Sequence, residues 1–214
     1  HEPNFLRRCR FLGVLGLVNN GSTQSVFYGS GYDIKEGTEM RGDMWSWNTL
    51  AGKPLHLSPE YSLLLGKSLS QKMGCEFTAP ESPHHKWGGY THEERPFHCL
   101  NNQIQISATT ASGQINALDL NVSGIMDVPI RELDNKYISF SLETAQRLLN
   151  TNHILRTAVQ LKDPSRQHDF ITRLQKEALS HHFKFDVIPV LQHQVAKLTR
   201  DGLVLISLFR RLFM

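Results

Sequence analysis

The sequence predicts an α+β fold with mixed sheets, and three stretches carry that prediction. In residues 10–32, two strand-like segments flank Asn20-Gly21, a dipeptide typical of hairpin turns. In residues 118–123, apolar and polar side chains alternate, as in a strand with one buried face. Residues 155–188 have the order strand, helix, strand, and such a βαβ unit places parallel strands in at least one sheet.

After the hairpin, the sequence predicts an irregular segment, a helix and a long loop. Residues 34–57 are polar and contain glycine, so no regular element is expected there. Ser58 is a suitable N-cap and Pro59 a suitable first residue for a helix that ends at Gly74. The inward-facing residues of this helix are Tyr61, Leu64, Leu65 and Met73. Residues 76–102 are rich in Pro, His and Gly and form a loop too long for a simple connector, so the segment is either mobile or an inserted functional segment.

The next stretch predicts a turn, two strands and a capped helix. Gly113 lies in a turn before the alternating strand, and residues 137–140 form a short strand. Ser141 can cap the following helix, and Glu143 lies in its first turn, where the helix dipole favours an acid. The apolar face of that helix consists of Leu142, Ala145, Leu148 and Leu149.

The βαβ unit begins with alternating residues at 155–161. Asp163 and Pro164 then open a helix, and residues 185–188 form the second strand. The apolar face of this helix consists of Phe170, Ile171, Leu174 and Ala178.

The C-terminal residues carry an apolar stripe at spacings of four and three, which predicts a long helix. The stripe consists of Leu191, Val195, Leu198, Gly202, Leu205, Phe209 and Leu212. One interpretation is an ordinary amphipathic surface helix. The other is a stalk that leads into a transmembrane helix beginning just past Met214.

Composition argues against several classes of protein. The chain has 214 residues and a formal net charge of +3, and no basic run is interleaved with aromatic residues, so a nucleic-acid partner is not expected. No stretch approaches the roughly 18 apolar residues that a membrane-spanning helix requires. The chain starts at His1 without a signal peptide, and we therefore expect it to be a segment of a larger protein.

No motif predicts catalysis or a cofactor. Gly66-Lys67-Ser68 resembles the end of a phosphate-binding loop, but Tyr61 stands where that motif needs its first glycine. Gly29-Ser30-Gly31 follows a strand but lacks the third glycine of a dinucleotide-binding fingerprint. No Ser, Cys or Thr lies in a nucleophile motif. The sequence therefore predicts a non-enzymatic domain with no cofactor, and ATP binding is expected elsewhere.

A cluster of imidazoles and one thiol offers a weak metal site. The candidate ligands are His84, His85, His92, His98 and Cys99. Imidazole and thiolate suit zinc or copper, but the spacing matches no closed structural site. A solvated His-rich loop is the alternative interpretation.

The three cysteines leave two interpretations open. Cys75 and Cys99 could form a disulfide that closes the long loop in an oxidising compartment, which leaves Cys9 over. Alternatively all three are reduced and partly buried, and the odd count favours this second interpretation.

Four aromatic residues lie in otherwise polar segments: Trp45, Trp47, Trp87 and Tyr90. They either fill the gap between subdomains or, if exposed, anchor a partner.

Several short patterns, in order and spacing, resemble a known family. Residues 63–74 are similar to its apolar-Gly-x-x-Leu-Ala-x-x-Leu-Gly helix, with Ser70 and Met73 as departures. Residues 110–117 and 122–125 are similar to its turn and second strand, and residues 144–149 to its Ala-Gln-x-Leu-Leu helix. The family is the extracytoplasmic core domain of MacB-type, FtsX-like ABC transporter permeases, which include the lipoprotein-releasing permeases.

This resemblance implies a bipartite core with an inserted second subdomain and a stalk. Residues 1–33 and 103–190 would form the two parts of the core, residues 34–102 the core helix with the inserted segments, and residues 191–214 the stalk helix. Residues 34–57 and 76–102 would contact a partner.

The resemblance also implies a location and partners. The domain would belong to an inner-membrane permease and face the periplasm or the extracellular side. The implied partners are an ABC ATPase, a second permease subunit, a periplasmic adaptor or carrier protein, and the membrane through flanking helices. The substrate would be a lipoprotein, a peptide or a drug. The alternative function is a stand-alone ligand-binding or metal-binding module.

Overall fold

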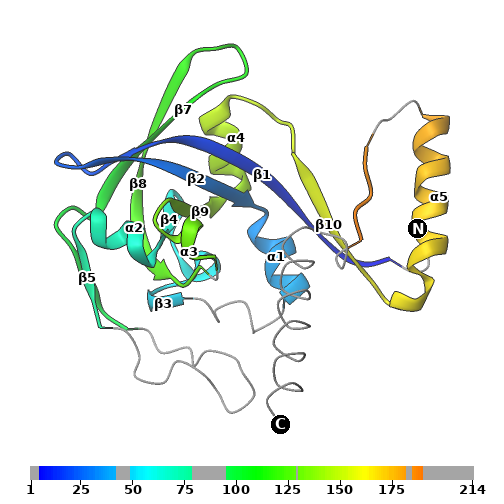
Figure 1. Cartoon of the computed structure of the whole chain (residues 1–214), viewed down its shortest axis with the longest axis horizontal. Helices are drawn as coiled ribbons and strands as arrows, with labels where there is room; N and C mark the ends of the chain where they lie inside the picture. The colour runs from blue at the N-terminus through cyan, green and yellow to red at the C-terminus, as the bar shows by residue number, and fades with distance from the viewer. Residues whose placement is uncertain (1–4, 42–48, 79–94, 129, 182–184, 190–214) are drawn as a thin grey trace, which may run out of the picture. The chain divides into compact units, whose positions relative to one another are not determined.

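The computed structural model describes residues 5–41, 49–78, 95–128, 130–181 and 185–189 (Figure 1). The strands are β1 (Phe5–Asn19), β2 (Gln24–Tyr32), β3 (Thr49–Gly52), β4 (Ser62–Gly66), β5 (Cys75–Phe77), β6 (Phe97–Cys99), β7 (Gln103–Thr109), β8 (Ile115–Met126), β9 (Tyr137–Ser141) and β10 (Arg156–Leu161). The helices are α1 (Ile34–Arg41), α2 (Lys67–Lys72), α3 (Arg131–Asp134), α4 (Leu142–Leu149) and α5 (Gln167–Ser180), with 3-10 turns η2 (Leu55–Leu57) and η3 (Pro164–Arg166).

Strands of the larger sheet close into a ring. The path runs β1-β2-β9-β4-β8, and β7 pairs with both β8 and β1, so the last strand returns to the first. The β2–β9 and β4–β8 pairs are parallel, whereas the other pairs of the ring are antiparallel. β3 extends β8 and β10 extends β1, and β5 and β6 form a separate two-stranded sheet. The predicted mixed α+β fold is therefore confirmed.

The main core lies inside this ring. Each of its strands contributes a buried apolar side chain, for example Phe27 on β2, Leu65 on β4 and Phe140 on β9. Helix α4 contacts β1, β2, β7, β8 and β9 and therefore lies across the ring, where it adds Leu142, Ala145 and Leu148 to the core. Gly31 permits this approach, because a Cβ there would stand only 2.4 Å from the Cβ of Ala145.

A second, smaller core lies on the outer side of the ring. Its buried members are Cys9, Tyr32, Leu55, Leu64 and Met126. Strand alternation explains the division, since Leu63 and Leu65 belong to the main core and Leu64 between them belongs to the second. Helix α1 packs against β1 and η2, and its residues Ile34 and Met40 contact this second core.

Several predicted elements are confirmed. The strand expected at 24–32 is β2, and Gly21 has a φ of +93° in the turn before it. The alternating strand is part of β8, and Gly113, with a φ of +82°, lies in the turn before that strand. Ser141 caps α4, because its Oγ accepts a hydrogen bond from the backbone N–H of Thr144 at 3.1 Å.

The helix predicted from Ser58 to Gly74 is wrong in its first half. Residues Ser62–Gly66 form β4, and only Lys67–Lys72 are helical. β4 is a central strand paired with β8 and β9, and it is buried throughout because the main core covers one face and the second core the other, so its apolar run has no alternation. Such a run cannot be told from a buried helix by periodicity. Tyr61, expected to face inward, is 41% exposed.

Two further predictions are corrected. Residues 34–57 were expected to be irregular, but they include α1, β3 and η2. Residues 185–188 were expected to form a strand, but they lie in no regular element. The βαβ unit at 155–188 is therefore wrong, and the parallel pairs come from β2–β9 and β4–β8 instead.

The chain divides into two compact units, and the first comprises the described residues Phe5–Gln160. The second includes α5, which starts after a 3-10 turn capped by Asp163, as the sequence predicts. The division into residues 1–33, 34–102, 103–190 and 191–214 stays a prediction, and the predicted C-terminal helix lies outside the described residues.

Candidate functional site

Most residues proposed from sequence lie outside the described part of the chain. This holds for the aromatic set Trp45, Trp47, Trp87 and Tyr90 and for the histidines His84, His85 and His92. It also holds for the stalk set Leu191, Val195, Leu198, Gly202, Leu205 and Phe209. Their roles stay predictions.

The two remaining metal candidates, His98 and Cys99, lie on β6. Cys99 is bonded to Cys75, so its sulfur is not available as a thiolate ligand. Among the described residues, no group of three or more His, Cys, Asp or Glu side chains is placed to hold a metal ion.

The disulfide corrects the preference for three reduced cysteines. Cys75 and Cys99 face each other across the β5–β6 pair and are buried against the main core, and Cys9 is free. The odd number of cysteines favoured the wrong prediction, because Cys9 is a buried core residue that takes part in no disulfide. The bond joins the first residue of β5 to the last residue of β6.

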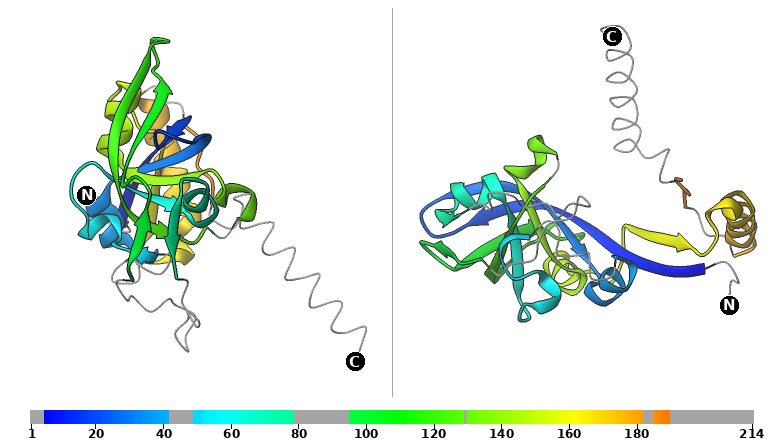
Figure 2. Two further views of the ribbon diagram at one scale, coloured as in Figure 1. Left: turned by 90° about the vertical axis from the view of Figure 1, so that its left-hand side faces the viewer. Right: turned by 90° about the horizontal axis from the view of Figure 1, so that it is seen from below.

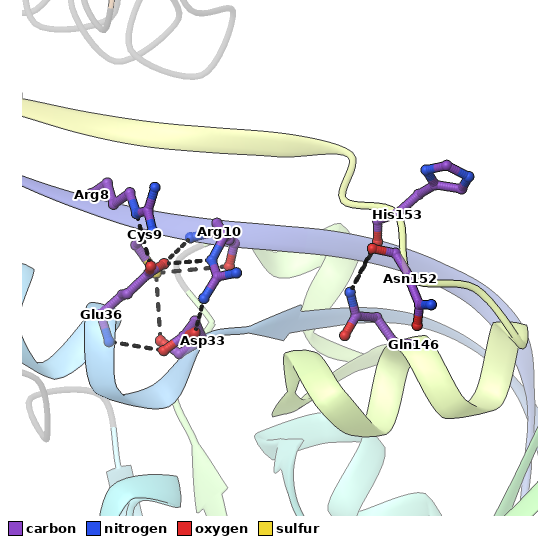
Figure 3. A network of polar contacts seen from close by, with 8 residues as sticks. All are labelled: Arg8, Cys9, Arg10, Asp33, Glu36, Gln146, Asn152 and His153. Carbon is purple, nitrogen blue, oxygen red and sulfur yellow. Dashed lines mark hydrogen bonds and ion pairs between the residues drawn. The ribbon is translucent and has the colours of Figure 1, made fainter.

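The described part of the chain contains a cluster of charged side chains that fastens the start of β1 to α1 (Figure 3). This ionic cluster consists of Arg8, Arg10, Asp33 and Glu36. The Glu36 carboxylate accepts hydrogen bonds from Arg8 Nε at 2.9 Å, from Arg10 Nε at 3.0 Å and from the Arg10 backbone N–H at 3.1 Å. Arg10 Nη2 also donates to Asp33 Oδ2 at 2.6 Å.

Asp33 links this cluster to the backbone of α1. Its Oδ1 accepts from the Glu36 N–H at 3.0 Å, as a helix N-cap does, and its own N–H donates to the Arg10 carbonyl at 3.1 Å. The position of Glu36 in the first turn of the helix is also favourable for a carboxylate. Strand β1 and helix α1 are thus joined by both backbone and side-chain bonds.

The electrostatics of the cluster follow from these contacts. The hydrogen bond to Glu36 is the main cause that raises the pKa of Arg10 above its ordinary value, with the Asp33 charge adding to it. Burial, reinforced by the Glu36 and Asp33 charges, raises the pKa of the Cys9 thiol from 9.0 to about 11. Cys9 is therefore an unreactive thiol at neutral pH.

The C-terminal half of β1 carries exposed apolar side chains on the face that points away from the ring interior. Leu15 is paired with Tyr28 and Leu17 with Val26, and these four side chains are 70%, 37%, 41% and 46% exposed respectively. Leu155 continues this surface, since its Cδ2 lies 3.4 Å from the place of a Cβ on Gly13. We call these five residues the outer stripe. No charged residue occurs between positions 11 and 32.

Neither the ionic cluster nor the outer stripe was predicted from the sequence, although signals for both exist. Arg8 and Arg10 are two apart on a strand, and Asp33 and Glu36 are three apart at a helix start. Pairing them required the β1–β2 register, which places Asp33 beside Arg10. The outer stripe follows from the same register, because alternation alone does not tell which face is covered.

Comparison with known proteins gives a likeness of fold. No protein-family model matches the sequence, and no curated protein matches it. The extracellular domain of the noncanonic ABC-type transporter YknZ from Gram-positive bacteria matches 85% of this chain and 79% of that domain, with a TM-score of 0.50 and 12% identity. The periplasmic region of MacB from Actinobacillus actinomycetemcomitans matches over 82% of this chain and 68% of that region, with a TM-score of 0.46 and 11% identity.

At 12% identity, the likeness to the YknZ domain shows that the two chains share a fold. In the described residues, no helix combines the length and the apolar character needed to cross a bilayer.

Proposed function

We propose that this chain is a non-enzymatic extracytoplasmic domain of an ABC transporter permease. The observation that carries the proposal is the fold shared with the YknZ extracellular domain over 85% of the chain. The sequence resemblance to MacB-type and FtsX-like permeases supports the same conclusion by a separate route. The domain couples ATP-driven movement of membrane helices to export or release of a lipoprotein, peptide or drug.

The disulfide supports an extracytoplasmic location. Such bonds persist in the periplasm and outside the cell, whereas cytosolic thiols are kept reduced. The Cys75–Cys99 bond is therefore in keeping with an inner-membrane protein whose domain faces the periplasm or the exterior.

The ionic cluster is the proposed mechanical connection. Movement that arrives along the N-terminal part of β1 passes through Arg8 and Arg10 to Glu36 and Asp33, and thus to α1 and the outer core. Three ion pairs connect β1 to Asp33 and Glu36, so loss of one charge weakens this connection but does not unfold the ring.

The proposed partners follow from this role. An ABC ATPase and a second permease subunit complete the transporter, and the flanking transmembrane helices hold it in the membrane. A periplasmic adaptor or carrier protein would contact the exposed outer stripe, whose lack of charge suits an apolar partner surface.

Cysteine labelling of cells with an intact inner membrane tests the location. Ile115 is 81% exposed, Cys9 is buried and the other two cysteines are bonded, so Ile115→Cys introduces the one accessible thiol among the described residues. A membrane-impermeant maleimide applied to cells with a permeabilised outer envelope should label this variant and leave the wild type unlabelled. Labelling that requires lysis of the inner membrane contradicts the proposal.

Affinity purification tests the transporter assignment. The full gene product, isolated from membranes with ATP and vanadate, should carry an ABC ATPase as a subunit or as part of its own chain. A preparation with no nucleotide-binding component contradicts the assignment.

A further inference from the structure

A cavity of about 140 Å³ opens beside the start of α4. Its apolar lining includes Ile34, Leu55 and Pro59, and its polar lining includes Ser62, Tyr61 and Arg147. A dry cavity of roughly 150 Å³ can hold a benzene molecule, so this one accommodates a single amino-acid side chain or its equivalent.

Tyr61 holds an unusual backbone conformation at the rim of this cavity. Its φ is +59°, a left-handed value that a bulky side chain adopts only under strain. The surrounding structure enforces it, since the Tyr61 carbonyl accepts a hydrogen bond from the Asn121 N–H at 2.8 Å. Residues held in this way cluster at ligand sites.

The strained backbone places the Tyr61 ring against Arg147. The guanidinium carbon lies 5.2 Å from the ring centroid, and Arg147 Nη1 donates a hydrogen bond to the Tyr61 hydroxyl. Glu143 is 3.6 Å from Arg147 Nη2, which is too long for a hydrogen bond. Arg147 is thus oriented by the tyrosine but only loosely paired with an acid.

One buried side chain in the cavity wall lacks its usual partner. Ser62 is 5% exposed, and its Oγ has no hydrogen-bond partner. By strand alternation it lies on the same side of β4 as Leu64, which is the side of the cavity-lining Leu55. At the start of α4, the Ser141 cap accepts the Thr144 N–H, and in general the other N–H groups of a first helical turn have no acceptor within their helix.

From these features we propose that the cavity binds the C-terminal residue of a peptide. The terminal carboxylate is held by the Arg147 fork and by the N–H groups at the start of α4, with Ser62 as a further donor. The apolar side chain of that residue fills the space between Ile34, Leu55 and Pro59. The ligand carboxylate displaces Glu143 from Arg147. This inference does not depend on the proposed transport function.

N-acetyl-leucine and N-acetyl-leucinamide are the probes, because they differ only in the charge that the site recognises. Titrations of the folded chain are followed by NMR chemical shifts or calorimetry. The acid should bind with a Kd of about 1 mM, and the amide at least about tenfold more weakly. Equal binding of the two probes, or no binding of the acid at about 10 mM, overturns the proposal.

Two variants probe two of the three charged residues that line the cavity, the third being Glu60. Arg147→Gln should weaken binding of the acid at least about tenfold, whereas Glu143→Gln should strengthen it, because the competing carboxylate is gone. Arg131→Gln is the matched control, since Arg131 is exposed on α3 and lies away from the cavity lining. Weaker binding in Glu143→Gln means that the cavity prefers a cation and overturns the proposal.

Tyr61→Gly separates the backbone strain from the binding role. Glycine adopts a positive φ at no steric cost, so the variant should unfold at the same or a higher temperature. Binding of N-acetyl-leucine should nevertheless fall, because Arg147 loses the ring that orients it. Unchanged affinity in this variant contradicts the proposed arrangement.

Discussion

The two halves of β1 are held by different forces. Between Leu12 and Val18, the side chains of Leu12, Val14 and Val18 are buried in the ring interior, and no charge is present. Around Arg8 and Arg10, the strand is held by ion pairs whose arginine side chains are 54% and 38% exposed. Apolar burial fixes the shape of the ring at any salt concentration, whereas exposed ion pairs are weak and screened by salt. The same long strand, which runs out of the ring in Figure 2, is therefore held by apolar burial in one half and by ion pairs in the other.

The largest expected loss of stability comes from truncating a large side chain in the ring interior. Phe140 is fully buried and makes an edge-on contact with Phe27, with ring centroids 6.4 Å apart. Phe140→Ala should lower the free energy of unfolding by about 3–5 kcal/mol, as measured by urea denaturation. Ile115→Ala, at an exposed position, should change it by less than about 0.5 kcal/mol. Similar losses in the two variants would show that the interior is not the main source of stability.

Removal of the disulfide should have the next largest effect. The bond closes a separation of 24 residues, which the chain-entropy model equates with about 3 kcal/mol. The double variant Cys75→Ala, Cys99→Ala should lose that amount in urea denaturation. Reducing agent should destabilise the wild type and leave the double variant unchanged. If reducing agent did not change the free energy of unfolding of the wild type, the presence of the disulfide would be contradicted.

Cys9 should make stability fall at alkaline pH. Its pKa is raised from 9.0 to about 11 in the folded state, so above pH 9 the unfolded chain releases a proton that the folded chain retains. Stability from this group is complete below pH 9 and is lost between pH 9 and 11, by up to about 3 kcal/mol. Cys9→Ala should show a shallower decline over this range. If the free energy of unfolding fell equally with pH in Cys9→Ala and in the wild type, the raised pKa of Cys9 would be contradicted.

The smallest effect should come from the ionic cluster. Glu36→Gln should cost about 1 kcal/mol at low salt, because its bonds are partly exposed, and less at about 0.5 M NaCl. Glu39→Gln, on the same helix and exposed, is the matched control and should change little. The loss in Phe140→Ala should be the same at both salt concentrations. A salt-independent loss in Glu36→Gln would remove the difference between the two halves of β1.

The sequence predicted best where one local rule decides the structure. The hairpin turn at Gly21, the alternation in β8 and the Ser141 cap each depend on residues close in the chain. It failed at β4, whose two faces are buried by the main core and the second core, both built from segments distant in sequence. The ionic cluster and the cavity beside α4 also depend on distant segments. No local pattern places Tyr61 beside Arg147, 86 positions further along.

Transport and ATP hydrolysis, measured side by side, test the central claim most directly. In the full transporter reconstituted in membranes, Glu36→Gln combined with Asp33→Asn should leave ATP hydrolysis near the wild-type rate while substrate export falls. Glu39→Gln should leave both unchanged. The account predicts this separation because the cluster passes movement from the N-terminal part of β1 to the rest of the domain. Export at the wild-type level in the double variant, at equal expression, would contradict it.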